Sequence, residues 1–175
     1  MNAEDIDRAL KRMAREIVDR ARAAELAIVG IRRGGVHLAE RLRRELAAAG
    51  RDAPLGTLDI ALYRDDLSER GSAPVVGPTD IRFSVQGKTI VLVDDVLYTG
   101  RTVRAALDEI VDFGRPRRVL LAVLVDRGGR ELPICPDVVG AQVEVAPGDQ
   151  VEVRLVEAGA EVDAVVVKPR GGEGA

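Results

Sequence analysis

Two adjacent aspartates and the turn that follows them are the residues of this sequence best suited to chemistry. Asp94 and Asp95 end an apolar run within VLVDDVLYTGRTVRAAL (91–107), and the turn YTGRT (98–102) opens a predicted helix. Backbone N–H groups at a helix start, together with the helix dipole, attract a phosphate. Carboxylates nearby can accept hydrogen bonds from vicinal hydroxyls. The pattern therefore indicates a site for a ribose 5-phosphate.

A simpler interpretation of the same residues stays open at this point. Two aspartates at a strand end, followed by a glycine turn, can be no more than a strand-to-helix connection with an aspartate cap. The sequence contains neither the GxxxxGK[ST] pattern of a phosphate loop nor the GxGxxG pattern of a dinucleotide fold. These absences weaken the interpretations as a nucleoside triphosphatase or a dinucleotide-binding enzyme.

Helical and strand patterns alternate along most of the chain. Apolar residues recur every three or four positions in three segments, 3–24, 36–50 and 101–114. Between them lie short apolar runs typical of buried strands, at 26–31, 55–63, 89–96 and 118–126. This alternation predicts an α/β fold with a mostly parallel central sheet and helices on both faces. Ligands of such sheets bind at the carboxyl ends of the strands, where Asp94 and Asp95 stand.

The remaining segments are shorter or less regular. Three β-branched segments, 137–145, 151–156 and 162–167, predict a smaller β region or antiparallel edge strands. The glycine- and proline-containing stretch 64–88 is long for a connection, and such loops are often functional lids or binding loops. We expect a single domain over 1–168 and a disordered tail over 169–175.

Composition excludes several classes of function. Aromatic residues make up 2% of the chain, which argues against base-stacking platforms and membrane belts. A single cysteine, Cys135, and a single histidine, His37, exclude an internal disulfide and metal centres built from several such ligands. The net charge of −3 is no general footprint for DNA, and no apolar run approaches the length of a membrane span. We expect a cytoplasmic protein.

The stretch 91–107 closely resembles the binding motif for 5-phosphoribosyl 1-diphosphate (PRPP) in type I phosphoribosyltransferases. With LYRDDL (62–67) and GRPRRVLLAVLVDRGGRELP (114–133), the chain resembles the PyrR family over about residues 4–167. The resemblance implies the type I fold with a small β hood and a flexible active-site loop. It implies a uracil phosphoribosyltransferase that forms UMP and pyrophosphate, uses Mg²⁺, and regulates pyrimidine genes through UMP-dependent binding of leader mRNA. It also implies a homodimer or larger homo-oligomer.

By the same resemblance, most of the expected site residues bind PRPP. Asp94 and Asp95 would hold the ribose hydroxyls directly or through Mg²⁺-bound water, as catalytic residues together with Arg33. The phosphate-binding and pyrophosphate-binding residues would be Val96, Leu97, Tyr98, Thr99, Gly100, Arg101, Thr102, Arg33, Gly34 and Arg82. Members of the family often have Thr-Arg-Gly where this chain has Arg33-Gly34-Gly35, so its arginine has moved by one position. Arg127 would lie beside the uracil ring, with Val151 as a second base-binding residue that could equally belong to the core.

The RNA-binding residues implied by the family are only partly present. Lys11, Arg12, Arg15 and Arg130 are the candidates, but this chain has Lys-Arg-Met-Ala-Arg (11–15) where the family typically has Thr-Arg-Ile-Ala-His. Helical arginines of this kind can hold RNA phosphates, and more commonly they form a solvated face. Three hypotheses remain: a transferase, a regulator that binds leader RNA, and a nucleotide sensor without turnover.

Overall fold

The computed structural model describes residues 1–22, 24–60 and 79–169. The helices are α1 (Ala3–Ala21), α2 (Gly34–Ala48), α3 (Arg101–Asp112) and the short 3₁₀ helix η3 (Val156–Ala158). The strands are β1 (Leu26–Ile31), β2 (Leu55–Leu58), β3 (Thr89–Leu97), β4 (Arg118–Asp126), β5 (Val138–Gln142), β6 (Gln150–Arg154) and β7 (Ala164–Lys168). None of the helices in these ranges is long and apolar enough to cross a membrane.

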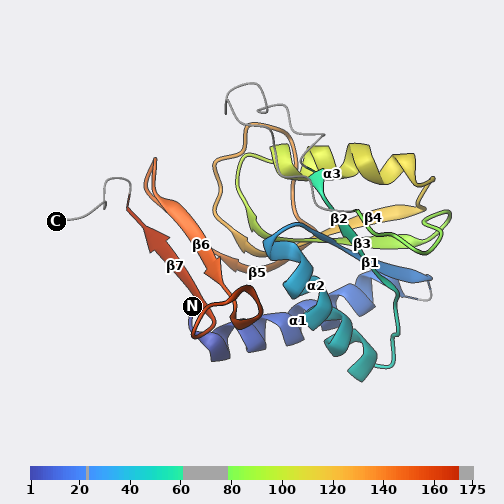
Figure 1. The fold of residues 1–175 in the computed structure, drawn as a ribbon, viewed down its shortest axis with the longest axis horizontal. Coiled ribbons are helices and arrows are strands. Elements are labelled where there is room, and N and C mark those ends of the chain that lie inside the picture. Colours follow the sequence, from blue (N-terminus) through green and yellow to red (C-terminus); the bar gives the residue numbers. More distant parts are fainter. Residues whose placement is uncertain (23, 61–78, 170–175) are drawn as a thin grey trace.

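The first five strands form one parallel sheet in the order β2-β1-β3-β4-β5. The strands β3 and β4 lie at its centre, and both are almost entirely buried along their length. The strands β6 and β7 form a separate antiparallel hairpin, the hood, which extends beyond one end of the sheet (Figure 1). The predicted α/β architecture with a largely parallel sheet and a smaller β unit is confirmed.

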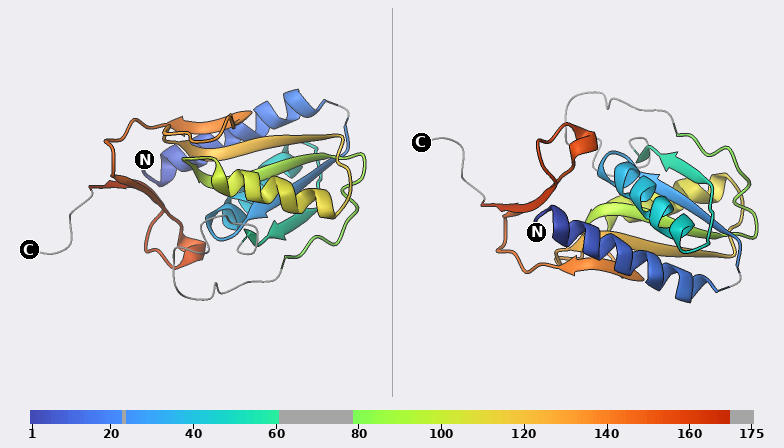
Figure 2. Two further views of the ribbon diagram at one scale, coloured as in Figure 1. Left: turned by 90° about the horizontal axis from the view of Figure 1, so that it is seen from above. Right: turned by 90° about the horizontal axis from the view of Figure 1, so that it is seen from below.

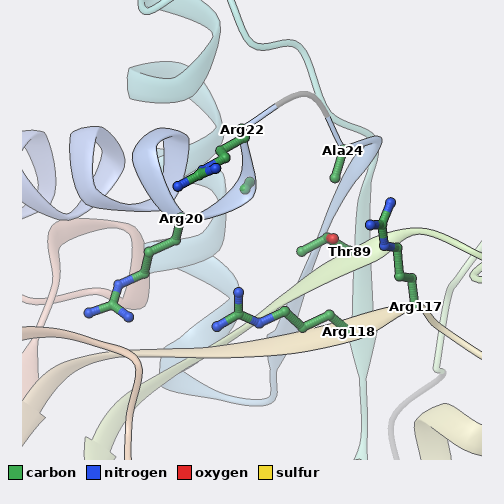
Figure 3. Close-up of a pocket in the computed structure, with 7 residues that line it drawn as sticks. Arg20, Arg22, Ala24, Thr89, Arg117 and Arg118 are labelled. Atoms are coloured by element: carbon green, nitrogen blue, oxygen red, sulfur yellow. The ribbon is translucent and has the colours of Figure 1, made fainter.

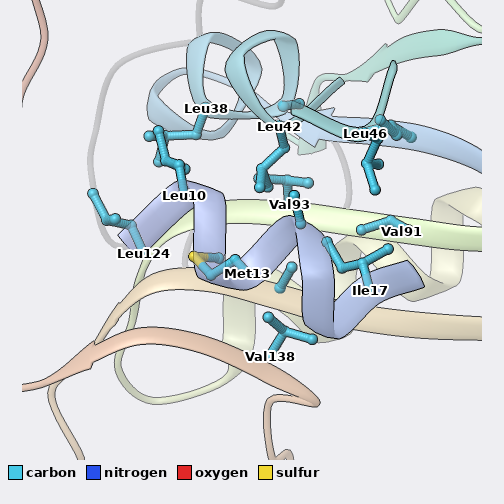
Figure 4. Close-up of a cluster of buried hydrophobic side chains, with 14 of the residues drawn as sticks. Leu10, Met13, Ile17, Leu38, Leu42, Leu46, Val91, Val93, Leu124 and Val138 are labelled. Atoms are coloured by element: carbon cyan, nitrogen blue, oxygen red, sulfur yellow. The ribbon is translucent and has the colours of Figure 1, made fainter. Parts of the chain in front are cut away.

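Helices cover both faces of the sheet, as Figure 2 shows in its two views. On one face α1 and α2 pack on the strands through a cluster that includes Met13, Ile17, Leu42 and Val91 (Figure 4). On the opposite face α3 buries Val103, Ala106 and Ile110 against alternating residues of the same strands. Apolar residues pointing to both faces explain why the central strands appear in the sequence as uninterrupted apolar runs.

Several predicted boundaries differ from those of the structure. The first helix ends at Ala21 rather than residue 24, and β2 ends at Leu58 rather than residue 63. The second helix begins at Gly34, two residues earlier than expected, so part of the glycine turn is helical. The residues 81–85 form no strand, and the preceding Asp80 makes an isolated antiparallel bridge with Thr57.

The prediction that residues 137–145 belong to a smaller β region or to an antiparallel edge strand is wrong. This segment forms β5, which extends the main sheet by pairing in parallel with β4. The side chain of Arg12 on α1 donates to the carbonyl oxygens of Val139 and Gly140, at 3.0 Å and 2.5 Å. This link between α1 and the edge strand has no local sequence signal, because it joins residues more than 120 positions apart.

The hood is attached to the body by an ion-pair cluster centred on Arg41 of α2. Its guanidinium donates to Asp163 at 2.5 Å and to Glu157, and the Arg41 side chain is 19% exposed. These hydrogen bonds lower the pKa values of Glu157 and Asp163 and raise that of Arg41. At the other end of the chain, the Met1 ammonium donates to the carbonyl of Val165, so the N-terminus also secures the hood.

Candidate functional site

The two aspartates lie at the carboxyl end of β3, at the centre of the sheet. Asp94 is 5% exposed, and its Oδ1 accepts the backbone N–H of Asp95 at 3.0 Å. Asp95 is half-buried, and its Oδ1 accepts the N–H of Val96 at 2.9 Å. These local hydrogen bonds fix the orientation of both carboxylates.

The loop between β1 and α2 packs directly against these carboxylates. A Cβ placed on Gly34 would lie 2.1 Å from Asp95 Oδ2, and one on Gly35 would lie 2.3 Å from the carbonyl oxygen of Val93. Only glycine permits so close an approach of the two chain segments. The loop thereby places Arg33, exposed and at the N-cap of α2, one residue before Gly34. The peptide bond between Arg32 and Arg33 is cis.

The turn before α3 presents an uncapped helix N-terminus at the same edge of the sheet. Gly100 occupies the N-cap position with φ 92°, a conformation that favours glycine. No side chain caps this terminus, and the first turn contains no acidic residue. The N–H of Arg101 makes a long contact of 3.4 Å with Thr99 Oγ1. The positive end of α3 is therefore available to an external anion.

The neighbouring segment 126–134 holds in place the turn 98–102, called the phosphate turn after its predicted ligand. Arg130 forms an ion pair with Asp126 at 2.7 Å and donates to the carbonyl oxygens of Tyr98 and Ile134 at 2.8 Å and 2.9 Å. Thr99 in turn accepts the N–H groups of Glu131 and Leu132 through its carbonyl oxygen. Arg101, expected to bind phosphate, forms an ion pair with Glu131 at 2.7 Å. The family resemblance implies RNA binding by Arg130, and this role stays a prediction; within the described chain, Arg130 contacts Asp126, Tyr98 and Ile134.

A cavity of about 370 Å³ separates the end of β3 from the hood. The residues around it are Val96, Tyr98, Arg127, Gly148, Asp149, Gln150 and Val151. The guanidinium of Arg127 lies 3.9 Å from the centre of the Tyr98 ring, within the range of a cation–π contact, and donates to the Asp149 carbonyl at 2.7 Å. The structure therefore brings together the two residues expected to bind the base, Arg127 and Val151. Val151 also packs against the core, so both interpretations of this residue have support.

Some residues around this cavity had no recognisable signal in the sequence. Asp149 and Gln150 belong to a PGDQ stretch (147–150) that is typical of a turn, and only the hood brings it opposite β3. Asp126 could have been inferred, because it ends β4 as Asp94 and Asp95 end β3. Its Oδ1 accepts the N–H of Gly128 at 2.9 Å in addition to pairing with Arg130.

Arg82 does not lie with these residues. It forms an ion pair with Asp80 at 2.8 Å, and its side chain is 87% exposed. Asp80 pairs with Thr57 in an antiparallel bridge, and Gly56 faces Ile81 and Phe83. The chain therefore runs from the carboxyl end of β2 back toward its amino end, which carries Arg82 away from Asp94 and Asp95. The residues 61–78, including LYRDDL and most of the expected active-site loop, lie outside the described residues, as do 170–175 of the expected tail.

The basic residues of α1 are on a different surface from the carboxylates. Arg12 is engaged by the carbonyl oxygens of β5, and Lys11 pairs with Asp7 at 2.8 Å. Arg15 is exposed and has no ion-pair partner among the residues described here. Of the three α1 residues expected to bind RNA, Arg15 is thus the one whose charge is not engaged within the described chain.

Comparisons with known proteins agree with this geometry. The family model for the phosphoribosyl transferase domain matches residues 2–154. The bifunctional protein PyrR of Roseiflexus sp. (strain RS-1) is 54% identical over 169 residues, which are 95% of this chain and 92% of that protein. The bifunctional protein PyrR of Pelotomaculum thermopropionicum is 52% identical over 170 residues, covering 96% and 94%.

Solved structures show the same fold at lower sequence identity. A ternary substrates complex of a hypoxanthine phosphoribosyltransferase from Trypanosoma cruzi has a TM-score of 0.74 at 23% identity, covering 96% of this chain and 92% of that one. A hypoxanthine-guanine phosphoribosyltransferase from Bacillus anthracis has a TM-score of 0.68 at 19% identity, covering 85% and 83%. The sheet order, the family model and the extent of the PyrR matches lead to one conclusion: the chain belongs to the phosphoribosyltransferases, and within them to the PyrR family.

Proposed function

We propose that this protein transfers the 5-phosphoribosyl group of PRPP to uracil, forming UMP and pyrophosphate. The observation that carries the proposal is the placement of Asp94 and Asp95 beside the uncapped N-terminus of α3, at the carboxyl end of the sheet. Carboxylates there suit the ribose hydroxyls, and the helix terminus suits the 5-phosphate. The cavity between Tyr98 and the hood then lies where a planar base would meet the sugar.

The binding of PRPP in this proposal uses three chain segments. The 5-phosphate accepts hydrogen bonds from the N–H groups of the phosphate turn, with the hydroxyls of Thr99 and Thr102 beside it. Asp94 and Asp95 accept from the ribose 2- and 3-hydroxyls. The pyrophosphate group lies toward Arg33 and Gly34, because the glycine loop holds α2 against Asp95. Arg33, exposed at the start of α2, provides a positive charge for the departing pyrophosphate.

The donor set at this edge fits Mg²⁺ carried by the substrate. Among the described residues there is no cluster of three or more groups that could cage a metal ion. Mg²⁺ commonly binds through one or two carboxylates together with substrate oxygens and water, and Asp94 and Asp95 provide such carboxylates. When bound, Mg²⁺ supplies positive charge that neutralises the pyrophosphate. In this proposal the protein contributes the two carboxylates and their fixed orientation.

The chemistry itself is a substitution at C1 of the ribose. The bond from C1 to the pyrophosphate oxygen breaks, a bond from C1 to uracil N1 forms, and the N1 proton leaves to solvent. Departure of pyrophosphate ahead of bond formation gives a transition state with positive charge on the sugar. A strong base is then unnecessary, and the protein acts mainly through positioning and electrostatics.

Recognition of uracil is assigned to the cavity beneath the hood. The Arg127 guanidinium is stacked on Tyr98 and hydrogen-bonded to the Asp149 carbonyl, so it is held rigidly at the cavity wall. Its Nε is buried and has no hydrogen-bond partner among the described residues. Backbone groups of 148–151 provide further donors and acceptors for a pyrimidine edge.

The test is an assay of base specificity. The protein is incubated with PRPP, Mg²⁺ and labelled uracil, with guanine, hypoxanthine and orotate in parallel reactions. UMP as the single product is the expected result. Product from a purine would overturn the assignment of the base, and absence of product with every base would favour a regulator without turnover.

We propose a second function, regulation of pyrimidine genes through UMP-dependent binding of leader mRNA. Membership in the PyrR family supports it, and Arg15 supplies an unengaged charge on α1. Arg15→Ala tests it better than Arg12→Ala, because loss of Arg12 also removes its hydrogen bonds to β5. We expect weaker RNA binding with unchanged UMP formation. If Arg15→Ala binds RNA with full affinity, the proposal that α1 is part of the RNA interface is wrong.

The proposal also covers the cellular location and the oligomeric state of the protein. We infer a cytoplasmic location, because PRPP and pyrimidine nucleotides are intracellular metabolites. We also infer assembly into a homodimer or larger homo-oligomer from the PyrR family. Light scattering coupled to gel filtration measures the mass directly, and a mass of one chain at micromolar concentration would contradict the assembly.

A further inference from the structure

A group of arginines surrounds a pocket at the opposite end of the sheet from Asp94 and Asp95. Arg20 and Arg22 come from the end of α1, and Arg117 and Arg118 come from the start of β4 (Figure 3). The first residue of β3, Thr89, lies among them. The pocket has a volume of about 360 Å³. We call it the arginine pocket.

The charges in the arginine pocket are only partly balanced. Arg20 pairs with Glu16 at 2.8 Å, and Arg118 pairs with Asp137 at a longer 3.4 Å. The guanidinium groups of Arg22 and Arg117 have no hydrogen bond or ion pair within the described ranges of the chain. Of the four arginines of the pocket, two are therefore paired with carboxylates and two are not, in a chain whose net charge is −3. Such a local excess of like charge is unfavourable unless an anion offsets it.

A purely structural role does not account for these arginines. Cations near a helix C-terminus can stabilise its free carbonyl groups. Here that role belongs to Arg51, which donates to the carbonyl oxygens of Arg22 and Ala24, the latter at 2.7 Å. Thr89 is also bound within the fold, because its N–H donates to the carbonyl of Glu25 at 2.8 Å. The guanidinium groups of Arg22 and Arg117 take no part in these hydrogen bonds.

We propose that the arginine pocket is a second anion site, which binds a compact phosphoanion with at least two phosphoryl groups. Guanidinium groups match the oxygen pairs of phosphates and form strong charge-assisted hydrogen bonds with them. The site is separate from the one assigned to PRPP. Arg118 and Asp126 lie at opposite ends of β4, which are about 26 Å apart at 3.3 Å per residue.

The surroundings of the pocket favour a compact anion over an extended nucleic acid. A nucleic acid would need a continuous track of free cations along the surface. Along α1 toward its N-terminus, Arg15 is exposed and unengaged among the described residues, but Arg12 is bound to β5, Lys11 to Asp7 and Arg8 to Asp5, so the free cations form no continuous track. The described residues that line the pocket include no aromatic ring on which a base could stack. Recognition is therefore of the phosphates themselves, whether they are free pyrophosphate or part of a nucleoside diphosphate.

The test counts binding sites on the full chain with labelled pyrophosphate in equilibrium dialysis. The double variant Arg22→Gln/Arg117→Gln removes the two unpaired charges and no described side-chain contact. We expect the parent to bind about two pyrophosphates per chain and the variant about one, with at least about tenfold weaker binding at the lost site. The rate of UMP formation should be the same in both proteins.

A matched control removes one nearby charge outside the pocket. Arg115 is exposed, precedes Arg117 by two residues and does not line the pocket. Arg115→Gln should keep both pyrophosphate sites. If this control weakens pyrophosphate binding as much as the double variant does, the effect is one of general electrostatics and the proposal is overturned. If the protein does not bind pyrophosphate at the proposed transfer site, the counts become one in the parent and none in the double variant. The two proposals can therefore fail separately.

Two further ligands decide what the pocket recognises. ADP should displace pyrophosphate from this site with an affinity within about threefold of pyrophosphate itself, since only phosphates are contacted. An ADP affinity more than tenfold higher would contradict recognition by phosphates alone. The last ligand is a 12-nucleotide single-stranded RNA. If it binds the parent and not the double variant, while both proteins bind the same number of pyrophosphates, the ligand of the pocket is RNA and the compact anion is refuted.

Discussion

The two ends of the parallel sheet are built in different ways. At the carboxyl end, the glycines of the loop before α2 closely approach Asp95 and the backbone of β3, and backbone hydrogen bonds fix Asp94 and Asp95. At the amino end, exposed arginines from α1 and β4 surround a pocket through flexible side chains. One end is defined by backbone positions and the other by side-chain charges. Changes at the first should affect both stability and catalysis, whereas changes at the second should affect binding alone.

The largest effect is expected from Gly35→Ala at the carboxyl end. The new Cβ would lie 2.3 Å from the carbonyl oxygen of Val93, which is backbone and cannot move aside cheaply. We expect the free energy of unfolding to fall by about 2–4 kcal/mol, with loss of most UMP formation. Urea denaturation and the transfer assay measure the two effects.

Gly50→Ala is the control for this substitution. Gly50 has φ 76°, and nothing lies within 4 Å of its Cβ position, so only backbone strain of about 1 kcal/mol applies. The variant should form UMP at the parent rate. Equal destabilisation by the two substitutions would show that the close packing of α2 on β3 contributes little.

The second effect, at Asp95, separates charge from packing at the same end. Asp95→Asn keeps an oxygen that can accept the N–H of Val96 and removes the negative charge. If the carboxylate holds the ribose hydroxyls, the affinity for PRPP should fall about tenfold to a hundredfold, because hydrogen bonds to charged groups contribute about 1.5–3 kcal/mol. Calorimetric titration with PRPP measures this, and Glu144→Gln on the exposed surface is a control of equal charge change. Unchanged affinity would refute the ribose assignment.

The fold was more predictable from the sequence than the site. Apolar runs such as 26–31 and 118–126 specified buried strands, because a strand covered on both faces has no polar alternation. The aspartates and the phosphate turn are contiguous in sequence, so their grouping was also foreseeable. Placement of β5 was not, because β5 pairs with β4 and contacts α1 through Arg12, a residue more than 120 positions away along the chain. The position of Arg82 was equally unpredictable. The chain direction at this residue follows from the bridge between Asp80 and Thr57, which are distant in sequence.

The hood provides an intermediate case, with side-chain ion pairs that are largely shielded from solvent. Arg41→Met keeps the aliphatic bulk of the side chain and leaves Glu157 and Asp163 without their cation. We expect a loss of about 1–3 kcal/mol in the free energy of unfolding at pH 7. Glu40→Gln, whose partner Arg44 is 63% exposed, is the matched control and should change stability by less than about 0.5 kcal/mol.

This ion-pair cluster also predicts a dependence on pH. The folded pKa values of Glu157 and Asp163 lie below the ordinary values of 4.5 and 3.8, because Arg41 donates hydrogen bonds to both. Groups with lowered folded pKa values stabilise the fold fully above their ordinary values, and lose that contribution as pH falls through the folded values. The difference in stability between the parent and Arg41→Met should therefore be constant near pH 7 and shrink below about pH 4.5. A difference that stays constant down to pH 3 would contradict this origin.

The smallest effect is expected at the arginine pocket, and it decides whether the two ends differ as described. Arg22 and Arg117 are exposed and unpaired within the described chain, so their side chains contribute almost nothing to folding. In the absence of phosphates, Arg22→Gln/Arg117→Gln should change the free energy of unfolding by less than about 0.5 kcal/mol. With millimolar pyrophosphate present, the parent should gain more stability than the variant, because an anion bound only to the folded state stabilises it. A large loss without any anion would mean that these arginines, like the glycines at the carboxyl end, serve the fold itself.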